Sequence, residues 1–263
     1  MRKKQIVSTV AAVLSVLLLL TACDSPAPLP VANSDKDSVH TQESQPASDI
    51  KIPEAMDIYE FSGYEWLVLD VQDDKMLILS NKILESREFN EFSPVISLEA
   101  NWEYCTLRAY LNGEFYENTF TKSEKSRIIE TEIQNKNNQW FGNDGGNDTL
   151  DKVFLLSLEE IVQYFGDSGQ LSSRLSDVTW HIDDEYNDAR IAQHVGGRYA
   201  QRDREDVYTI IDADAPWKWW LRSPGNYPNG AVWVTDTGTV LVSGETHHNY
   251  SSGVRPAMWI SYS

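Results

Sequence analysis

Cysteine is scarce in this sequence, which contains only Cys23 and Cys105 in 263 residues. Small secreted domains are often held by several disulfides, and two cysteines can form at most one. The chain must therefore be stabilised by a hydrophobic core. The roughly 210 residues that follow position 51 suffice for a single domain that buries about 70% of its unfolded surface.

Basic residues are also few, with 22 Lys and Arg against 40 Asp and Glu, for a formal net charge of −18. A charge of this sign repels phosphate backbones and anionic lipid headgroups. The composition therefore argues against nucleic-acid binding. It also predicts that any membrane contact is made through an anchor and not through a charged surface.

One long apolar run is present, Ile6–Leu20, and it is too short to span a bilayer comfortably. Basic residues at positions 2–4 precede it and small residues follow it, an order typical of a secretory signal peptide over residues 1–22. The run ends in Leu20-Thr21-Ala22-Cys23, which resembles a bacterial lipobox. The resemblance implies cleavage before Cys23 and diacylation of that cysteine. The alternatives are an ordinary signal peptide with an incidental cysteine, or a transmembrane anchor.

The lipobox predicts a location on the extracytoplasmic face of the cell membrane, held by palmitate-type lipid on Cys23. Residues 23–51 would then form the lipidated end and a linker, since Asp24–Lys51 is rich in Ser, Pro, Ala, Asp and Gln and cannot pack a core. A coil of this length has a dimension on the order of 30 Å. We expect one folded domain over residues 52–263.

The first half of this domain shows strand and helix patterns with recognisable turns and caps. Strands are predicted at Ile58–Phe61, Trp66–Val71, Met76–Leu79 and Val153–Leu156, with Gly63-Tyr64 and Asp73-Asp74 in turns. An apolar helical face runs from Trp102 to Phe115, ended or interrupted by Asn112-Gly113. Further helices are predicted at Thr121–Ile128, with a Thr121/Glu124 capping box, and at Leu158–Phe165 after Ser157.

The last third predicts four strands, Trp217–Arg222, Ala231–Asp236, Thr239–Ser243 and Val254–Ile260. A hairpin turn is expected at Asp236-Thr237-Gly238. The polar segment Gly166–Asp214 is expected to be an insertion, at about 166–214, with one helix around Asp188–His194. Together these elements predict an α+β domain around a small twisted antiparallel sheet.

Three motifs, Trp219–Gly225, Ala231–Val234 and Gly253–Ile260, resemble the signature of an uncharacterised domain family found on bacterial surface proteins and lipoproteins. The layout is more distantly similar to C-type-lectin-like folds of the formylglycine-generating-enzyme and phage variable-receptor kind. This second similarity implies a C-type-lectin-like α+β fold with small twisted antiparallel sheets and two or three short helices. It implies no activity, because the cysteine pair of the sulfatase-modifying enzymes is absent.

Two arginines in apolar strands, Arg222 and Arg255, need carboxylate or carbonyl partners if they are buried, so each is expected to clamp loops. Arg222 could instead bind a ligand. The tryptophans Trp219, Trp220, Trp233 and Trp259 are predicted to lie in the core. Trp217 and Tyr227, at the borders of strand and loop, are the expected exposed aromatics on which a glycan or peptide would stack.

Metal and catalytic candidates are weak. Asp144, Asp148 and Asp151 place oxygen ligands around two glycines, which suits Ca²⁺, although an Asx-turn loop explains the same residues. Glu245, His247 and His248 form a second candidate metal set or a solvated loop tip. Cys105 lies on an apolar helix face and is expected to be a buried thiol. No cofactor is indicated besides possible calcium.

The sequence therefore favours a lipid-anchored bacterial surface protein that acts as a non-enzymatic binding module for a glycan, protein or envelope ligand. The alternatives are an envelope-acting enzyme on a sulfatase-modifying-like fold and a structural spacer. An enzyme would show a concave pocket with a perturbed titratable group, and a binding module would show exposed aromatic side chains.

Overall fold

The computed structural model describes residues 53–91, 99–195, 198–202, 207–211, 215–246 and 252–262, with backbone alone for 198–202 and 207–211. These residues belong to the compact unit Ile50–Ser263. The predicted signal peptide, Cys23 and the linker lie outside the described residues.

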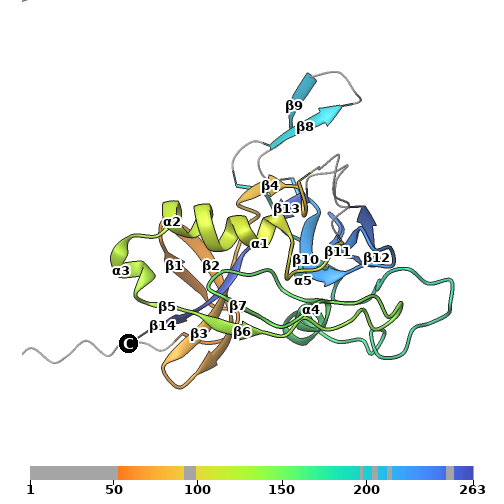
Figure 1. Ribbon diagram of the computed structural model, residues 1–263, viewed down its shortest axis with the longest axis horizontal. Coiled ribbons are helices and arrows are strands. Elements are labelled where there is room, and N and C mark those ends of the chain that lie inside the picture. The colour runs from red at the N-terminus through yellow and green to blue at the C-terminus, as the bar shows by residue number, and fades with distance from the viewer. Residues whose placement is uncertain are drawn as a thin grey trace, which may run out of the picture. The chain divides into compact units, whose positions relative to one another are not determined.

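The first large sheet has five antiparallel strands in the order β1-β2-β3-β14-β5 (Figure 1). Its strands are β1 (Ile58–Phe61), β2 (Tyr64–Gln72), β3 (Lys75–Ser80), β5 (Ile128–Ile129) and β14 (Ala257–Ser261). The three predicted N-terminal strands are confirmed. The turn between β1 and β2 is formed by Ser62 and Gly63, whose φ angles of 53° and 75° suit a tight hairpin of the primed type.

The second large sheet has the order β12-β11-β10-β13-β4 and is mixed, because β10 and β13 run parallel. Its strands are β4 (Glu85–Arg87), β10 (Trp219–Pro224), β11 (Gly230–Val234), β12 (Val240–Thr246) and β13 (Ser252–Val254). Two smaller pairs are formed by β6 (Thr131–Ile133) with β7 (Thr149–Asp151), and by β8 (Arg198–Arg202) with β9 (Val207–Ile211). The predicted turn glycine Gly238 has φ 82°.

The predicted single strand Val254–Ile260 is wrong, because the chain changes sheet within it. Val254 pairs with Glu85 in the second sheet, whereas Ala257 pairs with Leu79 in the first. The change takes place across Arg255-Pro256. Proline has no N–H to continue a ladder of hydrogen bonds, which is the physical reason for the break.

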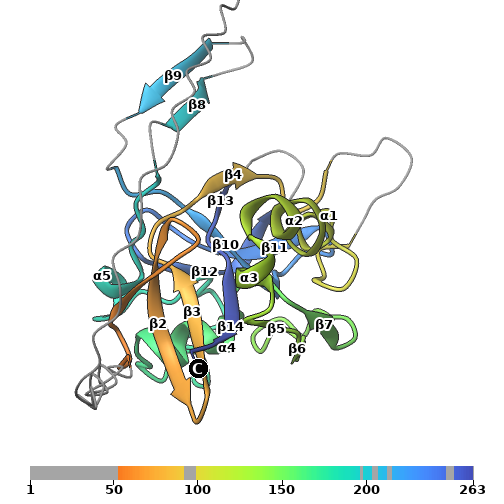
Figure 2. The ribbon, with the colours of Figure 1, turned by 90° about the vertical axis from the view of Figure 1, so that its left-hand side faces the viewer.

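The helical stretch consists of α1 (Thr106–Tyr110), a π-helical turn η1 (Leu111–Phe115) and α2 (Tyr116–Thr119), and Figure 2 shows it next to β14. Asn112-Gly113 interrupts the regular α-helix, as predicted, but does not end it. The Asn112 side chain donates to the carbonyls of Arg108 and Val153, at 3.2 and 2.8 Å, and accepts from the N–H groups of Lys152 and Val153. These bonds satisfy the helix at the wide turn and hold the following loop against it.

The predicted Thr121/Glu124 capping box and the predicted N-cap Ser157 are confirmed. Helix α4 (Leu158–Phe165) begins after Ser157 as predicted, with Glu160 completing the box. Helix α3 (Lys122–Lys125) has the Thr121/Glu124 box but is shorter than predicted, because the chain enters β5 at Ile128. No helix within the described ranges is both long and apolar enough to cross a membrane.

Two other predicted elements are corrected. Val153–Leu156 is not a strand: only Phe154 pairs, with Ala257, and the run is buried on all sides between β7 and α4. Helix α5 covers Asn187–Arg190 and ends before the predicted His194, because Gln193 and His194 form bridges to Pro216 and Ile83.

The segment predicted as an insertion contributes to the core of the domain. Leu171, Ile182 and Ala192 are buried, and Ile182 pairs with Val240 of β12. The core as a whole is built around four fully buried tryptophans, Trp66, Trp102, Trp219 and Trp220. The α+β class is confirmed.

Candidate functional site

Arg222 of β10 lies almost fully buried at the base of a hollow. Its guanidinium donates to both carboxylate oxygens of Glu160, at 2.5 and 3.0 Å, and to the carbonyls of Leu155 and Gln134, at 2.6 and 3.3 Å. Among the described residues Nε is its only nitrogen without a hydrogen-bond partner. The predicted clamp is therefore present, and Arg222 acts mainly as the floor of the site.

The hollow above Arg222, named here the Arg222 pocket, has a volume of about 250 Å³. Trp259 of β14 and Tyr164 of α4 supply ring surfaces. The polar rim has two parts. Gln134 and Lys136 lie in the loop after β6, and Glu159 and Gln163 lie on α4. This combination of ring faces and hydrogen-bonding groups in one concave site is typical of a small-molecule pocket.

Burial and the nearby carboxylates of Glu160 and Asp70 raise the pKa of Tyr164 to about 12. Its hydroxyl is therefore protonated at neutral pH and can donate a hydrogen bond. Trp259, predicted to be core, is only half-buried and forms a wall of the pocket. The Lys75 ammonium lies 4.6 Å from the centroid of its ring.

The predicted ligand residues are not brought together. Trp217 precedes β10 and Tyr227 follows it, so the strand that carries Arg222 separates them. Tyr227 is 52% exposed, as predicted. Trp217 is instead half-buried against the core, and its backbone N–H donates to the carbonyl of Ala192 at 3.0 Å. Trp219 and Trp220 are buried as predicted, and Trp233 is half-buried.

The other predicted clamp, Arg255, is also buried. It donates to the carbonyls of Ser80 and Asn81, at 2.8 and 3.3 Å, and stacks over Trp219, 4.9 Å from the ring centroid. Burial lowers the pKa of Arg255 to about 9. Its role is to fix the end of β3 to the second sheet.

The three candidate calcium ligands have separate protein partners. Asp144 accepts from the N–H of Gly146 in an Asx turn, and Asp148 accepts from the N–H of Asn135. The buried Asp151 binds Arg108, Trp102 and Thr149 at 2.7, 2.7 and 2.8 Å. In the described part of the chain no three His, Cys, Asp or Glu side chains gather as a metal site.

The second candidate metal set cannot be assembled from the described residues. His247 and His248 lie outside them, and Glu245 forms an ion pair with Lys218 at 3.2 Å. Cys105 is buried, and burial raises the pKa of its thiol to about 12. Its sulfur accepts from the N–H of Arg108 and caps α1, so it is held as a neutral thiol.

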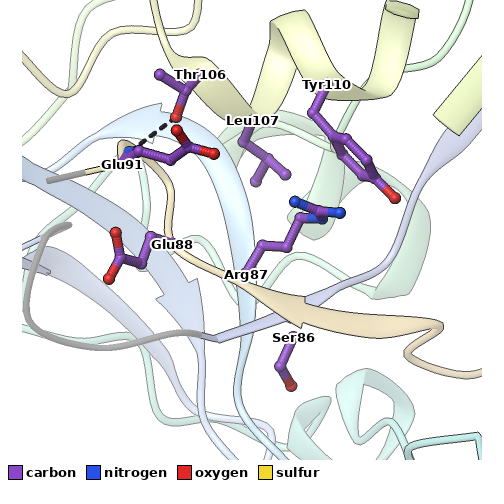
Figure 3. Close-up of a pocket in the computed structure, with 7 residues that line it drawn as sticks. All are labelled: Ser86, Arg87, Glu88, Glu91, Thr106, Leu107 and Tyr110. Atoms are coloured by element: carbon purple, nitrogen blue, oxygen red, sulfur yellow. Dashed lines mark hydrogen bonds between the residues drawn. The ribbon is translucent and has the colours of Figure 1, made fainter. Parts of the chain in front are cut away.

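A further hollow, of about 280 Å³, lies between β4 and α1 and is shown in Figure 3. There the Arg87 guanidinium lies 3.4 Å from the centroid of the Tyr110 ring and binds Glu85 at 2.9 Å. The cation is thus already engaged. The Ser86 side chain points away from the other labelled residues, toward the opposite side of the strand.

On that side the Ser86 hydroxyl lies 3.4 Å from Nε2 of His194, whose Nδ1 lies 2.8 Å from the carbonyl oxygen of Val195. The carbonyl contact favours a proton on Nδ1, which leaves Nε2 as an acceptor for the serine hydroxyl. This contact is a serine–histidine pair that the sequence patterns did not indicate, because the two residues are 108 positions apart.

Gln134, Lys136 and Gln163 were also missed from the sequence. They occupy exposed positions with no spacing pattern of their own. An indirect signal was available. A buried arginine such as Arg222 requires an acidic partner, and Glu160, which follows the N-cap Ser157, could have been recognised as that partner and so have placed α4 beside Arg222.

Comparison with known proteins identifies a family. A family model described as a domain of unknown function, DUF6273, matches residues 73–262, a range that includes Arg222, Trp259 and the whole Arg222 pocket. No curated protein and no solved structure matches significantly. The predicted likeness to an uncharacterised domain family is thus confirmed, and no structural match to a C-type lectin fold accompanies it.

Proposed function

We propose a binding function for this chain, which belongs to the DUF6273 family of domains of unknown function. The ligand that suits the Arg222 pocket is one unit of an uncharged glycan of the cell envelope. The observation that carries this proposal is the half-buried Trp259 ring beside a rim of amide and ammonium groups.

A sugar ring has an apolar face of C–H groups and an edge of hydroxyls. Trp259 offers a ring surface for the face, and Gln134, Gln163 and Lys136 offer hydrogen bonds for the edge. The volume of about 250 Å³ is below the range of about 300–1,000 Å³ that holds drug-sized ligands. A single ring is therefore the appropriate size of occupant.

Charge favours a neutral ligand. The Arg222 guanidinium is already bound to both oxygens of Glu160 and to two carbonyls, so it offers a ligand carboxylate or phosphate little pairing. The net charge of −18 also repels anionic polymers at long range.

The anchor completes this proposal. Lipid on Cys23 would hold the protein on the extracytoplasmic face of the cell membrane, and the linker up to residue 51 would extend the domain toward envelope material. The finer fold assignment, a C-type-lectin-like domain, is part of the same proposal. The two five-stranded sheets, the short helices and a late Gly-Val-Arg-Pro-Ala crossing between strands support it.

An envelope-acting hydrolase is the second candidate, and the Ser86–His194 pair favours it. The serine oxygen would attack an ester carbonyl while His194 accepts its proton and passes it to the departing alcohol as the ester C–O bond breaks. Water would then hydrolyse the acyl-serine, releasing the carboxylic acid and restoring Ser86. Labelling of the full-length protein by a fluorophosphonate, lost in Ser86→Ala and in His194→Gln, would support this candidate. Absence of labelling at Ser86 would reject it. A spacer would show neither labelling nor ligand binding.

The binding proposal is tested with the full-length chain in detergent and a panel of uncharged hexoses and N-acetylhexosamines, by calorimetry. We expect Gln163→Ala to weaken binding about tenfold, the effect of one or two lost hydrogen bonds. Asn118→Ala is the matched control, because it also removes an exposed helical amide, on α2. Binding by no member of the panel, or equal loss in both variants, would contradict the proposal.

A further inference from the structure

A second hollow adjoins the Arg222 pocket along helix α4. It has a volume of about 360 Å³ and shares two residues with the pocket, Glu159 and Gln163. Its far side is formed by Leu171 and Ser172. We name it the α4 hollow. The two shared side chains are the boundary between the hollows, so the hollows lie next to each other along α4.

An aromatic cluster lies beyond the α4 hollow. Trp140 is joined to a residue that lines the α4 hollow, because its indole N–H donates to the carbonyl of Leu171 at 2.9 Å. Phe141 is 6.5 Å from Trp140 and 6.2 Å from Trp180, measured between ring centroids. Arg174 lies over both Trp140 and Phe141, at 5.1 and 4.7 Å. Trp140, Phe141, Arg174 and Trp180 come from two segments of the chain, and together they are named the aromatic loop.

The outer edge of the aromatic loop is unusually apolar for an exposed segment. Trp180 is 42% exposed, and Val178 and Leu175 are 80% and 72% exposed. Large apolar side chains gathered on a surface mark interaction sites more often than isolated ones do. Trp180 is linked to the α4 hollow through Phe141, Trp140 and the lining residue Leu171.

The loop is held in place before any ligand arrives. The Trp180 carbonyl accepts from the N–H of Ser243 at 3.1 Å, which fixes it to β12. Arg174 Nε donates to the Thr179 carbonyl at 2.8 Å. A ring surface that is already ordered loses less conformational entropy on binding than a mobile one.

We infer that the Arg222 pocket, the α4 hollow and the aromatic loop form one groove for a linear, uncharged glycan of several units. The inference rests on the proposed function and names the length and class of its ligand. Ring faces stand at both ends, Trp259 at one and the aromatic loop at the other, with polar side chains between them. Successive rings of a polymer can stack on such platforms without requiring a particular sequence, as bases do on aromatic residues.

The charges of the groove favour a glycan over a peptide. Negative and positive side chains nearly balance along the groove. The carboxylates are Glu132, Glu159, Glu160 and Asp167, and the cations are Lys136, Arg174 and Arg222. A peptide is usually selected by apolar pockets for alternate side chains. In the α4 hollow only Val162 and Leu171 are apolar, and the other lining residues can bond to hydroxyls.

The test is calorimetry of the full-length chain in detergent with N-acetylglucosamine oligomers of one to six units, an uncharged linear glycan. We expect affinity to rise at least tenfold between the monosaccharide and the longest oligomer. Trp180→Ala and, separately, Phe141→Ala should remove about tenfold from the long oligomer and leave the monosaccharide unchanged. Tyr227→Ala is the control, since it removes an exposed ring that lines neither hollow.

The outcomes separate the groove from the pocket. Binding of the monosaccharide with no gain from longer oligomers would overturn the groove and leave the proposed function standing. If no oligomer binds, the groove is overturned. If, in addition, no sugar of the uncharged panel binds, the proposed function is overturned as well. A neutral hexapeptide that binds while the oligomers do not would overturn the glycan assignment. As a control for folding, the melting temperatures of Trp180→Ala and Phe141→Ala should equal that of the parent protein.

Discussion

Arg222 and Glu160 form a two-pronged ion pair that ties β10 to the first turn of α4, with donor–acceptor distances of 2.5 and 3.0 Å. The same Glu160 accepts the N–H of Ser157 and so completes the capping box of α4. One carboxylate therefore fixes both the start of the helix and the floor of the Arg222 pocket.

Glu160→Gln should destabilise the domain by about 2–3 kcal/mol. Glutamine can still cap the helix, but the buried guanidinium loses its counter-charge. The expected loss lies below the usual 3–5 kcal/mol because the Glu160 side chain is a quarter exposed. Urea unfolding measures it. Glu159→Gln, in the same helical turn, is the control and should change stability by less than about 0.5 kcal/mol.

Asp151→Asn should cost about 3 kcal/mol. The Asp151 carboxylate is fully buried and accepts from the indole of Trp102, the guanidinium of Arg108 and the hydroxyl of Thr149. An amide nitrogen at this position would face donors, and Arg108 would lose its carboxylate partner and keep only its bonds to backbone carbonyls. Thermal unfolding of Asp151→Asn beside Asp148→Asn, which is exposed, measures the difference. A calcium-dependent rise in melting temperature that Asp148→Asn abolishes would contradict this structural role.

Trp219→Ala should cost about 3–5 kcal/mol, because a fully buried indole leaves a large cavity. Tyr227→Ala should cost under about 0.5 kcal/mol, since half of that side chain is in solvent. Trp217→Ala should lie between them, because Trp217 is half-buried. Chemical denaturation gives the order, and equal values for the three variants would show that the burial pattern is incorrect.

Cys105 should make stability fall at alkaline pH. Burial raises the pKa of its thiol to about 12 in the folded chain, against about 8.5 when unfolded. Between these values the unfolded thiol loses its proton and the folded thiol keeps it, so the free energy of unfolding decreases as pH rises. Relative to Cys105→Ser, the parent should lose stability above about pH 8.5. Parallel pH profiles for the two proteins would argue against a buried neutral thiol.

Cys23→Ser should abolish incorporation of radioactive palmitate and leave an uncleaved or shed precursor. The physical basis is the proposed lipid anchor, since the thiol of Cys23 is the acceptor in a lipobox. Metabolic labelling followed by fractionation measures both effects. Cys105→Ser, which removes the other cysteine, should label normally, and labelling of Cys23→Ser would refute the anchor.

The sequence predicted elements well where a local signal marked both ends. Helix α4 begins after Ser157 and ends at Phe165 as expected, because its capping box and apolar face lie within nine consecutive residues. The run Val254–Ile260 was predicted as one strand because its apolar pattern indicates burial. That pattern does not show with which strand each residue pairs. The π turn at Asn112 depends on contacts with Lys152 and Val153, forty positions away, which no local pattern contains.

The candidate site was predicted only in part. Arg222 was identified because a cation in an apolar strand demands partners, and those partners proved to be Glu160 and two carbonyls. Trp259 was assigned to the core because its strand is apolar, although its side chain lines the Arg222 pocket. The aromatic loop was missed because Trp140 and Trp180 lie forty residues apart and meet only through Phe141.

The crossing at Arg255-Pro256 has a consequence for how the domain opens. Arg255 holds two carbonyls at the end of β3 while it stacks on Trp219 of β10, so one residue is shared by both sheets. Neither sheet can come apart without exposing this contact and straining the two-residue link between β13 and β14. We therefore expect amide protons in β3, β10 and β14 to exchange through a single cooperative opening, so that Arg222 and Trp259 face a ligand as parts of one rigid body.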